Sequence, residues 1–237
     1  KEKYVVITDT NVVVNIDFKD MIQSRIDSGA DVTIAYNQQE IPESLRQSTG
    51  IDKGYYYAFD IEDGRITKIY VNSRAEGVQN FSMNMFVVER ELLIELIDTA
   101  FVNGDEFFER DVLMPQLNKL NIHAYKYEGY LARICDMKSY FDENMKLLDD
   151  YNLDALFEGS PIYTKIHDDN PTRYIEGAKA QNVMTADGCV IEGEVENSIL
   201  FRGVKIARGA RVKNCILMQG TVVEAGVDAE YLIMDKN

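Results

Sequence analysis

The chain is poor in cysteine, proline and histidine and contains no tryptophan among its 237 residues. Its three cysteines are odd in number and are not spaced as in a CxxC motif, so the sequence predicts neither a disulfide framework nor a zinc site. We expect Cys135, Cys189 and Cys215 to be buried small apolar residues in a reducing compartment. The sequence also has no apolar run long enough to cross a bilayer and no signal-peptide pattern, and we therefore expect a cytoplasmic location without membrane contact.

Basic residues are scarce as well. The 25 lysines and arginines stand against 40 aspartates and glutamates, which gives a formal net charge of −15. A surface for nucleic acid or anionic membrane needs a basic footprint to meet phosphate groups, so the composition argues against both partners. One local group of basic residues is a candidate partner surface or site for a phosphorylated small-molecule effector, and a solvated face without function explains it equally well: Arg202, Lys205, Arg208, Arg211 and Lys213.

The last quarter of the sequence repeats itself. The segment VENSILFRG at residues 195–203 returns as VKNCILMQG at 212–220 and, in shorter form, as AEYLIM at 229–234. Aliphatic residues fall at roughly hexapeptide spacing, with small residues or glycine between them. This period is typical of stacked coils that share one continuous core. The sequence therefore predicts a left-handed parallel β-helix over residues 179–237.

The first 150 residues carry the alternating strands and helices of an α/β domain. An apolar run at residues 4–8 predicts a strand buried in a parallel sheet, and a helix follows that begins after Asp17 and ends at Gly29. Residues 31–36 predict the next strand, and this βαβ order favours a doubly wound sheet with right-handed crossovers. Because the chain begins within such a strand and without methionine, we expect an amino-terminal part of the domain to be missing.

Later elements follow from the same signals. We expect a hairpin that turns at Asp63-Gly64, a strand over residues 82–88, and a helix that ends at Gly104. One core-facing stripe of that helix carries Leu92, Leu93, Leu96, Ile97, Ala100 and Phe101. The remaining expectations are a loop over 37–54 with Pro42 and Gly50, a helix over about 106–119 limited by Pro115, strands over 122–127 and 130–135, a helix over 140–148, and a turn-rich connector over 151–178.

Polar residues follow several of the predicted strands. In a doubly wound sheet, ligands bind beyond the carboxyl ends of the strands, and the sequence places candidate residues there: Asp9, Asn11, Asp17, Asn72, Asn84, Arg133 and Asp136. No Gly-rich phosphate loop precedes them. Taken singly, each of these residues is more often part of a solvated loop than of a site.

Five segments together resemble the sugar-nucleotide pyrophosphorylases and, among them, bacterial ADP-glucose pyrophosphorylase, or glucose-1-phosphate adenylyltransferase. These are residues 7–17, 64–72, 82–86, 128–148 and 194–204, and their order and spacing agree with that family along essentially the whole chain. The resemblance implies a partial nucleotidyltransferase-like sheet followed by the β-helix. It also implies a reaction in which the phosphate of glucose 1-phosphate attacks the α-phosphate of ATP, with Mg²⁺ held by two aspartates.

The chain departs from the family pattern at both metal positions. Asn11 stands where the family has its first metal-binding aspartate, and Thr10 stands where it has glycine. Arg133 stands at the second metal-binding aspartate, where a guanidinium would repel Mg²⁺. Asp9 is a candidate substitute, but a displacement of two residues moves its carboxylate several ångströms along the chain. The resemblance therefore implies no metal site and no catalytic residue in this chain.

The family's sugar-phosphate pocket and nucleotide loop are altered too. Asn72 replaces the lysine of Glu-Lys-Pro, Asn84 replaces the glycine of Ser-Met-Gly, and the Gly-rich loop is absent. Such losses resemble those of the GlgD-type, non-catalytic members of the family. The resemblance implies a regulatory or structural subunit without a cofactor of its own, which forms a homo- or hetero-oligomer with a catalytic pyrophosphorylase subunit. Residual sugar-nucleotide binding would involve Asp9, Ser82, Glu128, Tyr130 and Asp136.

Three alternatives stay open. An active Mg-dependent glucose-1-phosphate adenylyltransferase would need Asp9 and Asp136 to replace the missing ligands. A hexapeptide-repeat assembly module would use its coils only for contacts with neighbours. A hexapeptide acyltransferase would need a histidine as general base, but His123 and His167 both lie outside the repeats. We expect His123 to be a structural or edge residue of a strand and His167 to be exposed.

Overall fold

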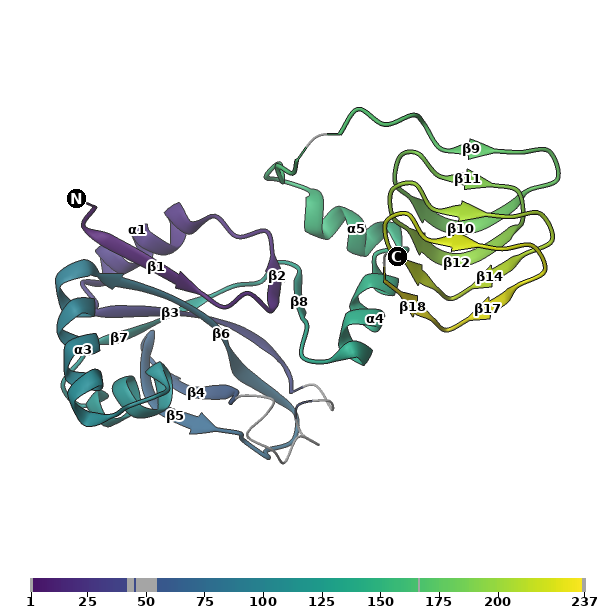
Figure 1. Ribbon diagram of the computed structural model, residues 1–237. Helices are drawn as coiled ribbons and strands as arrows, with labels where there is room; N and C mark the ends of the chain where they lie inside the picture. The colour runs from purple at the N-terminus through teal and green to yellow at the C-terminus, as the bar shows by residue number, and fades with distance from the viewer. Residues whose placement is uncertain (1, 42–44, 46–54, 166, 236–237) are drawn as a thin grey trace. The chain divides into compact units, whose positions relative to one another are not determined.

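The computed structural model describes residues 2–41, 45, 55–165 and 167–235, and Figure 1 shows their helices and strands. The chain divides into two compact units, residues 1–135 and 136–237. The second unit begins just before helix α4 (Met137–Lys146) and also contains helix α5 (Asp150–Phe157). The division therefore falls earlier than residue 150, and part of the segment expected to be a connector is helical.

A six-stranded mixed sheet is the centre of the first unit, with the strand order β1, β6, β3, β7, β5, β4. The bounds are Tyr4–Thr8 (β1), Val32–Glu40 (β3), Tyr57–Glu62 (β4), Arg65–Val71 (β5), Val78–Glu89 (β6) and Ile122–Lys126 (β7). Neighbours β3 and β7 are parallel, and the other neighbours in this order are antiparallel. The chain passes from β1 through helix α1 (Phe18–Ser28) to β3, and antiparallel β6 lies between these two strands.

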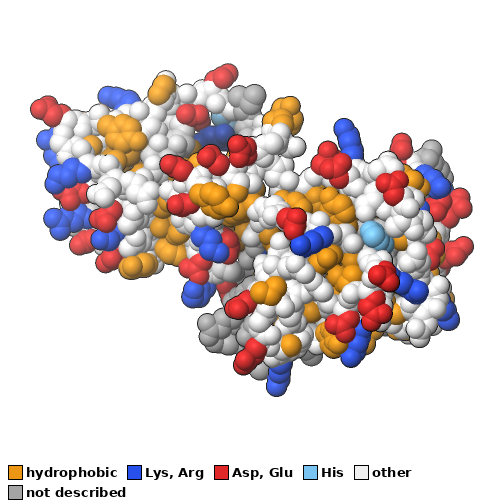
Figure 2. All heavy atoms as spheres, turned by 180° about the vertical axis from the view of Figure 1, so that it is seen from behind, with side chains coloured by type: hydrophobic (Ala, Val, Ile, Leu, Met, Phe, Trp, Pro, Cys, Tyr) orange, Lys and Arg blue, Asp and Glu red, His pale blue; other side chains and the backbone are white. Residues whose placement is uncertain are grey.

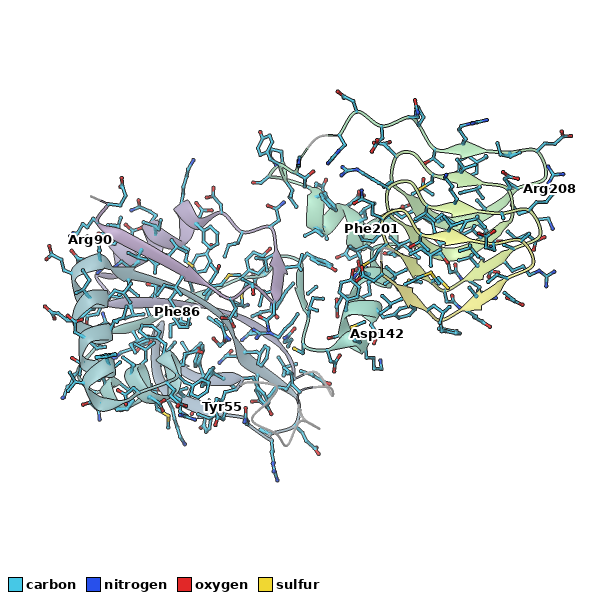
Figure 3. All side chains as sticks on the ribbon, viewed as in Figure 1. Tyr55, Phe86, Arg90, Asp142, Phe201 and Arg208 are labelled. Atoms are coloured by element: carbon cyan, nitrogen blue, oxygen red, sulfur yellow. The ribbon has the colours of Figure 1, made fainter. Side chains whose placement is uncertain are left out.

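Helices cover both faces of this sheet. On one face, Met21 of α1 shares a core with Met85 of β6. On the other face, Leu96 of helix α3 (Arg90–Asn103) shares a core with Phe86, which is labelled in Figure 3. Met85 and Phe86 are adjacent in β6 and reach opposite cores because successive side chains of a strand point to opposite faces. The predicted α/β architecture, a sheet between helical layers, is confirmed.

Local signals place several elements where the sequence predicts them. The Asp17 carboxylate accepts a hydrogen bond from the Lys19 backbone N–H at 2.8 Å and begins α1, and Gly29 ends this helix in the left-handed conformation. Asp63 and Gly64 both have positive φ, 48° and 78°, as a two-residue turn between β4 and β5 requires. The predicted helix start and hairpin are therefore confirmed.

The segment after α3 differs from its prediction. Instead of one α-helix over 106–119, a π-helix η2 (Phe108–Leu113) is followed by the 3₁₀-helix η3 (Met114–Gln116). Pro115 has no backbone N–H, so it ends the regular helical hydrogen bonding where the sequence predicts a limit. Strand β3 also continues to Glu40, into the region expected to be a loop, while Pro42 and Gly50 of that loop lie outside the described residues.

Two burial expectations are wrong. Helix α3 does not bury its whole apolar stripe, because Ile97 and Phe101 are 53% and 87% exposed while Leu93 and Leu96 are buried. Strand β1 lies at the edge of the described sheet and pairs with antiparallel β6, so its residues are only partly buried. Figure 2 shows that other hydrophobic side chains are also exposed between charged ones on the face it presents. Exposed single hydrophobic residues are common on folded proteins.

Short parallel strands form a solenoid in the second unit. Its strands are β9 (Arg173–Tyr174), β10 (Lys179–Thr185), β11 (Val190–Ile191), β12 (Glu194–Leu200), β13 (Lys205–Ile206), β14 (Arg211–Lys213), β15 (Ile216–Leu217), β16 (Val222–Val223), β17 (Asp228–Glu230) and β18 (Ile233–Met234). They stack as β10-β12-β14-β17, as β12-β15-β18 and as β9-β11-β13-β16. These three stacks confirm the predicted parallel β-helix, and its left-handed sense stays a prediction.

Equivalent positions of successive coils stack inside the solenoid. Val195, Val212 and Ala229 pair in register and are all buried. Cys189 and Cys215 are buried in the same core as free thiols, and Cys135 of the first unit is a partly buried free thiol. The expected burial of the cysteines is therefore confirmed for the two in the repeats. None of the described helices is long and apolar enough to cross a membrane.

Gly193 is the glycine of the solenoid with the least room around it. A Cβ built on it would lie 2.5 Å from the Ala210 carbonyl oxygen and 2.7 Å from the Ala207 carbonyl oxygen, whereas a Cβ on Gly203 would have no atom within 4 Å. Gly203 needs its glycine for another reason, a φ of 70°. A substitution at Gly193 therefore tests the close packing of coils, and a substitution at Gly203 tests backbone strain.

We expect Gly193→Ala to lower the free energy of unfolding by about 2–3 kcal/mol, because the added methyl group pushes two coils apart. Gly203→Ala should cost only about 1 kcal/mol, the usual penalty for a non-glycine residue in the left-handed region. Urea unfolding followed by circular dichroism measures both. Equal losses for the two variants would contradict the packing argument.

Candidate functional site: a buried polar cluster in the first unit

The two-stranded ribbon of β2 (Val12–Val14) and β8 (Leu131–Arg133) brings together Asn11 and Arg133, the two positions at which the family resemblance predicts metal ligands. Val12 lies opposite Arg133 in this antiparallel pair, and the Ile134 backbone N–H donates to the Asn11 carbonyl oxygen at 2.8 Å. Asn11 and Arg133 are far apart in the sequence but neighbours in the ribbon. The structure therefore joins the two positions that the family resemblance assigns to one site.

Strand β6 supplies the next members of the site. Asn84 has a φ of 52° within the strand, and its backbone N–H donates to the Ser82 hydroxyl at 3.1 Å. The Asn84 side-chain amide donates to the Asp9 carboxylate, and the Asp9 backbone N–H donates to the Asn84 carbonyl oxygen at 3.2 Å. This left-handed residue bends the strand locally and turns Asn84 toward the end of β1. Asp9 is thus held by Asn84.

A glutamate from the π-helix completes the site, and the sequence reasoning missed it. Glu109 is only 4% exposed, and the Ser82 hydroxyl donates to its Oε1 at 2.7 Å. Burial raises the pKa of Glu109 to about 8, an effect that the nearby Asp9 charge increases and that the Ser82 hydrogen bond and the Arg133 charge reduce. The carboxyl group is therefore close to half-protonated near pH 8.

Arg133 lies at the centre of these residues. Its guanidinium is 8% exposed, donates through Nη2 to the Ser82 carbonyl oxygen at 2.6 Å, and stacks 4.7 Å from the centre of the Phe81 ring. Burial lowers its pKa, whereas the Cys135, Asp9 and Glu109 groups raise it. We call Asp9, Ser82, Asn84, Glu109 and Arg133 the polar cluster.

The polar cluster does not fit the divalent metal that the family resemblance implies. Mg²⁺ is held by negatively charged oxygen ligands, whereas of the two positions that the resemblance assigns to metal ligands one carries the buried Arg133 guanidinium and the other the neutral Asn11 amide. Among the described residues, no three histidine, cysteine, aspartate or glutamate side chains converge in a way that could hold a metal ion. What the cluster can do chemically is hold the Arg133 guanidinium near Asp9 and near a carboxyl group, Glu109, that ionises around pH 8.

Asn72 lies outside the polar cluster, and its hydrogen bonds go to the backbone of a neighbouring segment. It has a φ of 50° at the end of β5, its Oδ1 accepts from the Tyr56 N–H at 3.1 Å, and its own N–H donates to the Tyr56 carbonyl oxygen at 2.9 Å. No hydrogen bond found among the described residues links it to the polar cluster. The asparagine therefore closes the open end of the β4-β5 hairpin.

The three remaining candidates for sugar-nucleotide binding have structural partners of their own. Glu128 is exposed and accepts from Lys126 Nζ at 2.6 Å, which lowers its pKa. The Tyr130 carbonyl oxygen accepts from the Tyr127 hydroxyl at 3.2 Å. The Asp136 carboxylate forms the capping box of α4 with Ser139. Of the five predicted binding residues, only Asp9 and Ser82 belong to the polar cluster.

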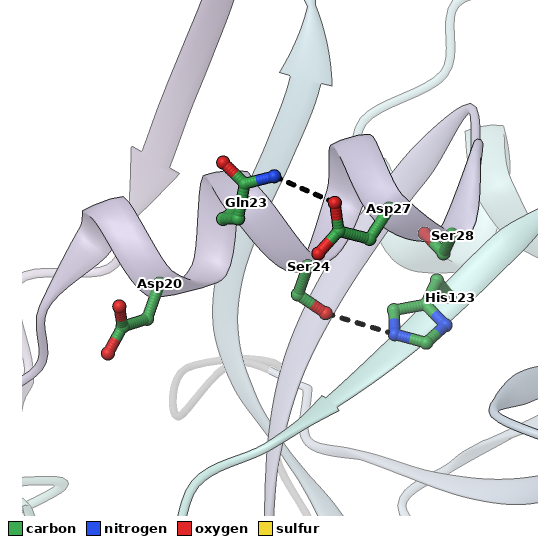
Figure 4. A pocket seen from close by; sticks show the side chains of 6 residues that line it. All are labelled: Asp20, Gln23, Ser24, Asp27, Ser28 and His123. Atoms are coloured by element: carbon green, nitrogen blue, oxygen red, sulfur yellow. Dashed lines mark hydrogen bonds between the residues drawn. The ribbon is translucent and has the colours of Figure 1, made fainter.

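A separate shallow pocket of about 480 Å³ surrounds His123 on β7 (Figure 4). Its Nε2 lies 3.2 Å from the Ser24 hydroxyl of α1, and burial lowers its pKa. A serine-histidine pair could be a nucleophile and base, but Asp27, an acid that lines the pocket, accepts from the Gln23 amide at 2.7 Å and turns away from the ring. His123 therefore links a helix to the sheet, as the sequence predicts, and His167 is exposed.

Known proteins match the chain along both units. A model of the C-terminal hexapeptide region of GlmU-like proteins matches residues 165–237. The glycogen biosynthesis protein GlgD of Bacillus subtilis is 30% identical over 237 residues, which are 100% of this chain and 57% of that protein.

Two proteins of Geobacillus stearothermophilus are similar as well. Its GlgD is 34% identical over 90% of this chain and 50% of its own length, and its glucose-1-phosphate adenylyltransferase is 32% identical over 89% and 53%. The chain therefore spans between half and three fifths of these relatives. The resemblance inferred from the five segments is confirmed.

Glu109 makes stability depend on pH. Its pKa in the folded protein is about 8, and its ordinary value is 4.5, so the folded state binds more protons than the unfolded state between these pH values. Raising the pH through this window therefore destabilises the fold, by at most about 1.4 kcal/mol per pH unit. We expect Glu109→Gln to flatten this slope in urea unfolding measured from pH 5 to 8. Replacement of the exposed Glu106 by Gln is the matched control and should keep the slope.

Arg133 should hold the polar cluster together. We expect Arg133→Met to cost about 3 kcal/mol in the free energy of unfolding at pH 7, because the Ser82 carbonyl loses its buried donor and Glu109 its nearby positive charge. Without that charge the pKa of Glu109 rises further, so the pH-dependent window should extend above pH 8. Arg74→Met, at an exposed position, should change the free energy of unfolding by less than about 0.5 kcal/mol, as is usual for surface substitutions, and should leave the pH-dependent window unchanged. An unchanged stability of Arg133→Met would contradict this role.

Proposed function

We propose, from the similarity of the whole chain to GlgD proteins and glucose-1-phosphate adenylyltransferases of glycogen biosynthesis, that this protein is a non-catalytic subunit of glucose-1-phosphate adenylyltransferase. Its role would be regulatory or structural. The catalytic subunit would convert ATP and glucose 1-phosphate to ADP-glucose and pyrophosphate, and this protein would bind that subunit in a cytoplasmic hetero-oligomer. The polar cluster is the feature that carries the proposal.

The buried guanidinium of Arg133 is the single most important observation. Phosphoryl transfer between two polyanions depends on positive charge placed against the reacting phosphates, and in the family a metal ion held by two carboxylates provides it. Here the guanidinium is already engaged by the Ser82 carbonyl oxygen and the Phe81 ring. Turning it toward a substrate would leave that carbonyl without its donor. A guanidinium that is already held by contacts within the chain supports a structural role for this site.

Glu109, an acidic residue beside the guanidinium, also supports a structural role for the polar cluster. A cluster with a buried guanidinium needs a nearby carboxylate, because an unpaired buried charge costs several kcal/mol. Asp9 lies near the guanidinium, Glu109 adds negative charge as it ionises around pH 8, and Ser82 bonds to both Glu109 and Arg133 through its hydroxyl and carbonyl groups. The residues therefore balance one another without a ligand. Such a site stabilises the fold and has no group poised to act on a phosphate.

The alternative of an active enzyme would have to use Asp9. Its carboxylate is at the end of β1, beside the cluster, but it accepts from Asn84 and faces the Arg133 charge. A metal ion held there would stand close to a guanidinium, which Coulomb repulsion disfavours. Direct measurement of turnover separates the two functions.

We expect the purified protein alone to form no ADP-glucose at high protein concentration and millimolar Mg²⁺. Co-expressed with a catalytic glucose-1-phosphate adenylyltransferase from the same organism, it should co-purify and change the kcat, the KM or the effector response of that enzyme. Robust turnover by the protein alone would overturn its inactivity. Failure to co-purify would overturn its role as a subunit. Arg133→Met should not create activity, since no carboxylate replaces the guanidinium.

A further inference from the structure

One face of the solenoid carries charges in a regular alternation of sign. Along β10, β12, β14 and β17, in-register pairing places four outward side chains in one row: Lys179, Glu194, Arg211 and Asp228. A second row on the same strands holds Gln181, Glu196, Lys213 and Glu230. We call these two rows the charge grid. Its first row reads plus, minus, plus, minus, and its second reads neutral, minus, plus, minus.

The charge grid is open to solvent. Residues between the two rows point inward, as buried Val195 and Val212 do, so the grid residues must point outward. The side chains of Lys179, Arg211 and Glu194 are 74%, 68% and 42% exposed. A shallow groove of about 750 Å³ runs along this face and is lined by grid residues. The face can therefore meet another surface without rearrangement of the coils.

Ion pairs within one chain account for part of this pattern. Lys179 Nζ lies 2.6 Å from the Glu194 carboxylate, Arg211 Nε lies 3.6 Å from it, and Lys213 Nζ lies 3.3 Å from Glu196. Exposed pairs of this kind contribute about 0–1 kcal/mol each, so they add modestly to the stacking of coils. They also show that Arg211 and Lys213 of the basic group predicted from the sequence are already paired with carboxylates, which argues against a free anion site there.

The order of signs is self-complementary. Consider a two-fold axis that lies in the contact plane, runs parallel to the strands and passes between β12 and β14. Lys179 then faces Asp228 of a second copy, and Glu194 faces its Arg211. In the other row, Glu196 faces Lys213 of the copy. The alternative in-plane axis, along the stacking direction, would set Glu194 against Glu196 and Arg211 against Lys213, so like charges would repel.

We infer that the charge grid is a contact surface for a second copy of this chain, related by the two-fold axis parallel to the strands. The grid holds three cations and four carboxylates, so it is nearly neutral in a chain of net charge −15. Two copies therefore meet less repulsion there than the net charge of the whole chain would give, and opposite charges set the register. This inference does not depend on the proposed function, because it concerns contact between like chains.

The size of the face sets the expected affinity. Four strands spaced about 4.8 Å apart cover only a few hundred Å², well below the roughly 800 Å² per partner of a standard stable interface. The contact should therefore be weak and transient at the concentrations of ordinary assays. Because its specificity rests on exposed charges, it should also weaken with added salt.

Complementary charge reversal tests the inference. The first variant carries Glu194→Arg and Glu196→Lys, and the second carries Arg211→Glu and Lys213→Glu. Each variant alone sets like charges against like across the two-fold axis, and its self-association should weaken at least about tenfold. An equimolar mixture restores opposite charges at every altered contact and should associate again. Sedimentation velocity at low salt, with protein concentrations up to the millimolar range, measures all three.

Two controls separate contact between copies from folding of the coils. Mixing cannot repair repulsion within a chain, so recovery in the mixture reports only contacts between chains. Circular dichroism checks that each variant keeps its strands. Lys205→Glu, on the stack that contains β13, should leave association unchanged. A protein that stays monomeric throughout, or a mixture no heavier than its components, would overturn the inference.

Discussion

The buried guanidinium of Arg133 is the constraint around which the first unit's polar interior is arranged. A cation that is 8% exposed must be compensated where it lies, because the desolvation of an unpaired charge costs several kcal/mol. Ser82 gives it a carbonyl oxygen, Phe81 gives it a ring face, Asp9 lies near it, and Glu109 adds negative charge as it ionises around pH 8. The unusual π-helix η2 matters for the same reason, since it is the element that carries Glu109 into the cluster. The polar interior of the first unit is thus held together by side chains of the chain itself.

The second unit depends on a different constraint, the stacking of equivalent residues in successive coils. Each coil places a small or aliphatic residue above its equivalent in the coil before, as Val195, Val212 and Ala229 show, and close approach at Gly193 leaves no room for a Cβ. The same register that aligns the interior also aligns the exterior. Outward residues therefore form rows even where they have no function, and a second surface that contacts this face interacts with all the charges of a row at once. Alternation of sign keeps neighbouring coils from repelling one another and gives the face a defined direction.

Much of the architecture could be predicted because it rests on short-range signals. Short-range interactions set the caps of α1, the turn at Asp63-Gly64 and the repeat period. Each involves residues close together in the chain, so each is visible as a pattern in the sequence. Burial of α3 was predicted less well, because a helix that is apolar on two sides does not reveal which side meets the sheet, and Phe101 is exposed. The helix expected over 106–119 failed for a related reason: the widened turn of a π-helix has no hydrophobic period of its own in so short a segment.

The sequence by itself determined the repeats and the α/β character of the first unit, and it places Asn11 and Arg133 where the family resemblance predicts metal-binding aspartates, since each of these is a property of residue types in order. Only the tertiary structure decided which residues surround Arg133. Glu109 joins Ser82 and Arg133 through contacts between a π-helix, a central strand and a two-stranded ribbon that are distant along the chain. Nothing in a local pattern distinguishes a glutamate destined for burial from one at the surface. Its environment, and with it its raised pKa, exists only once these elements have packed around it.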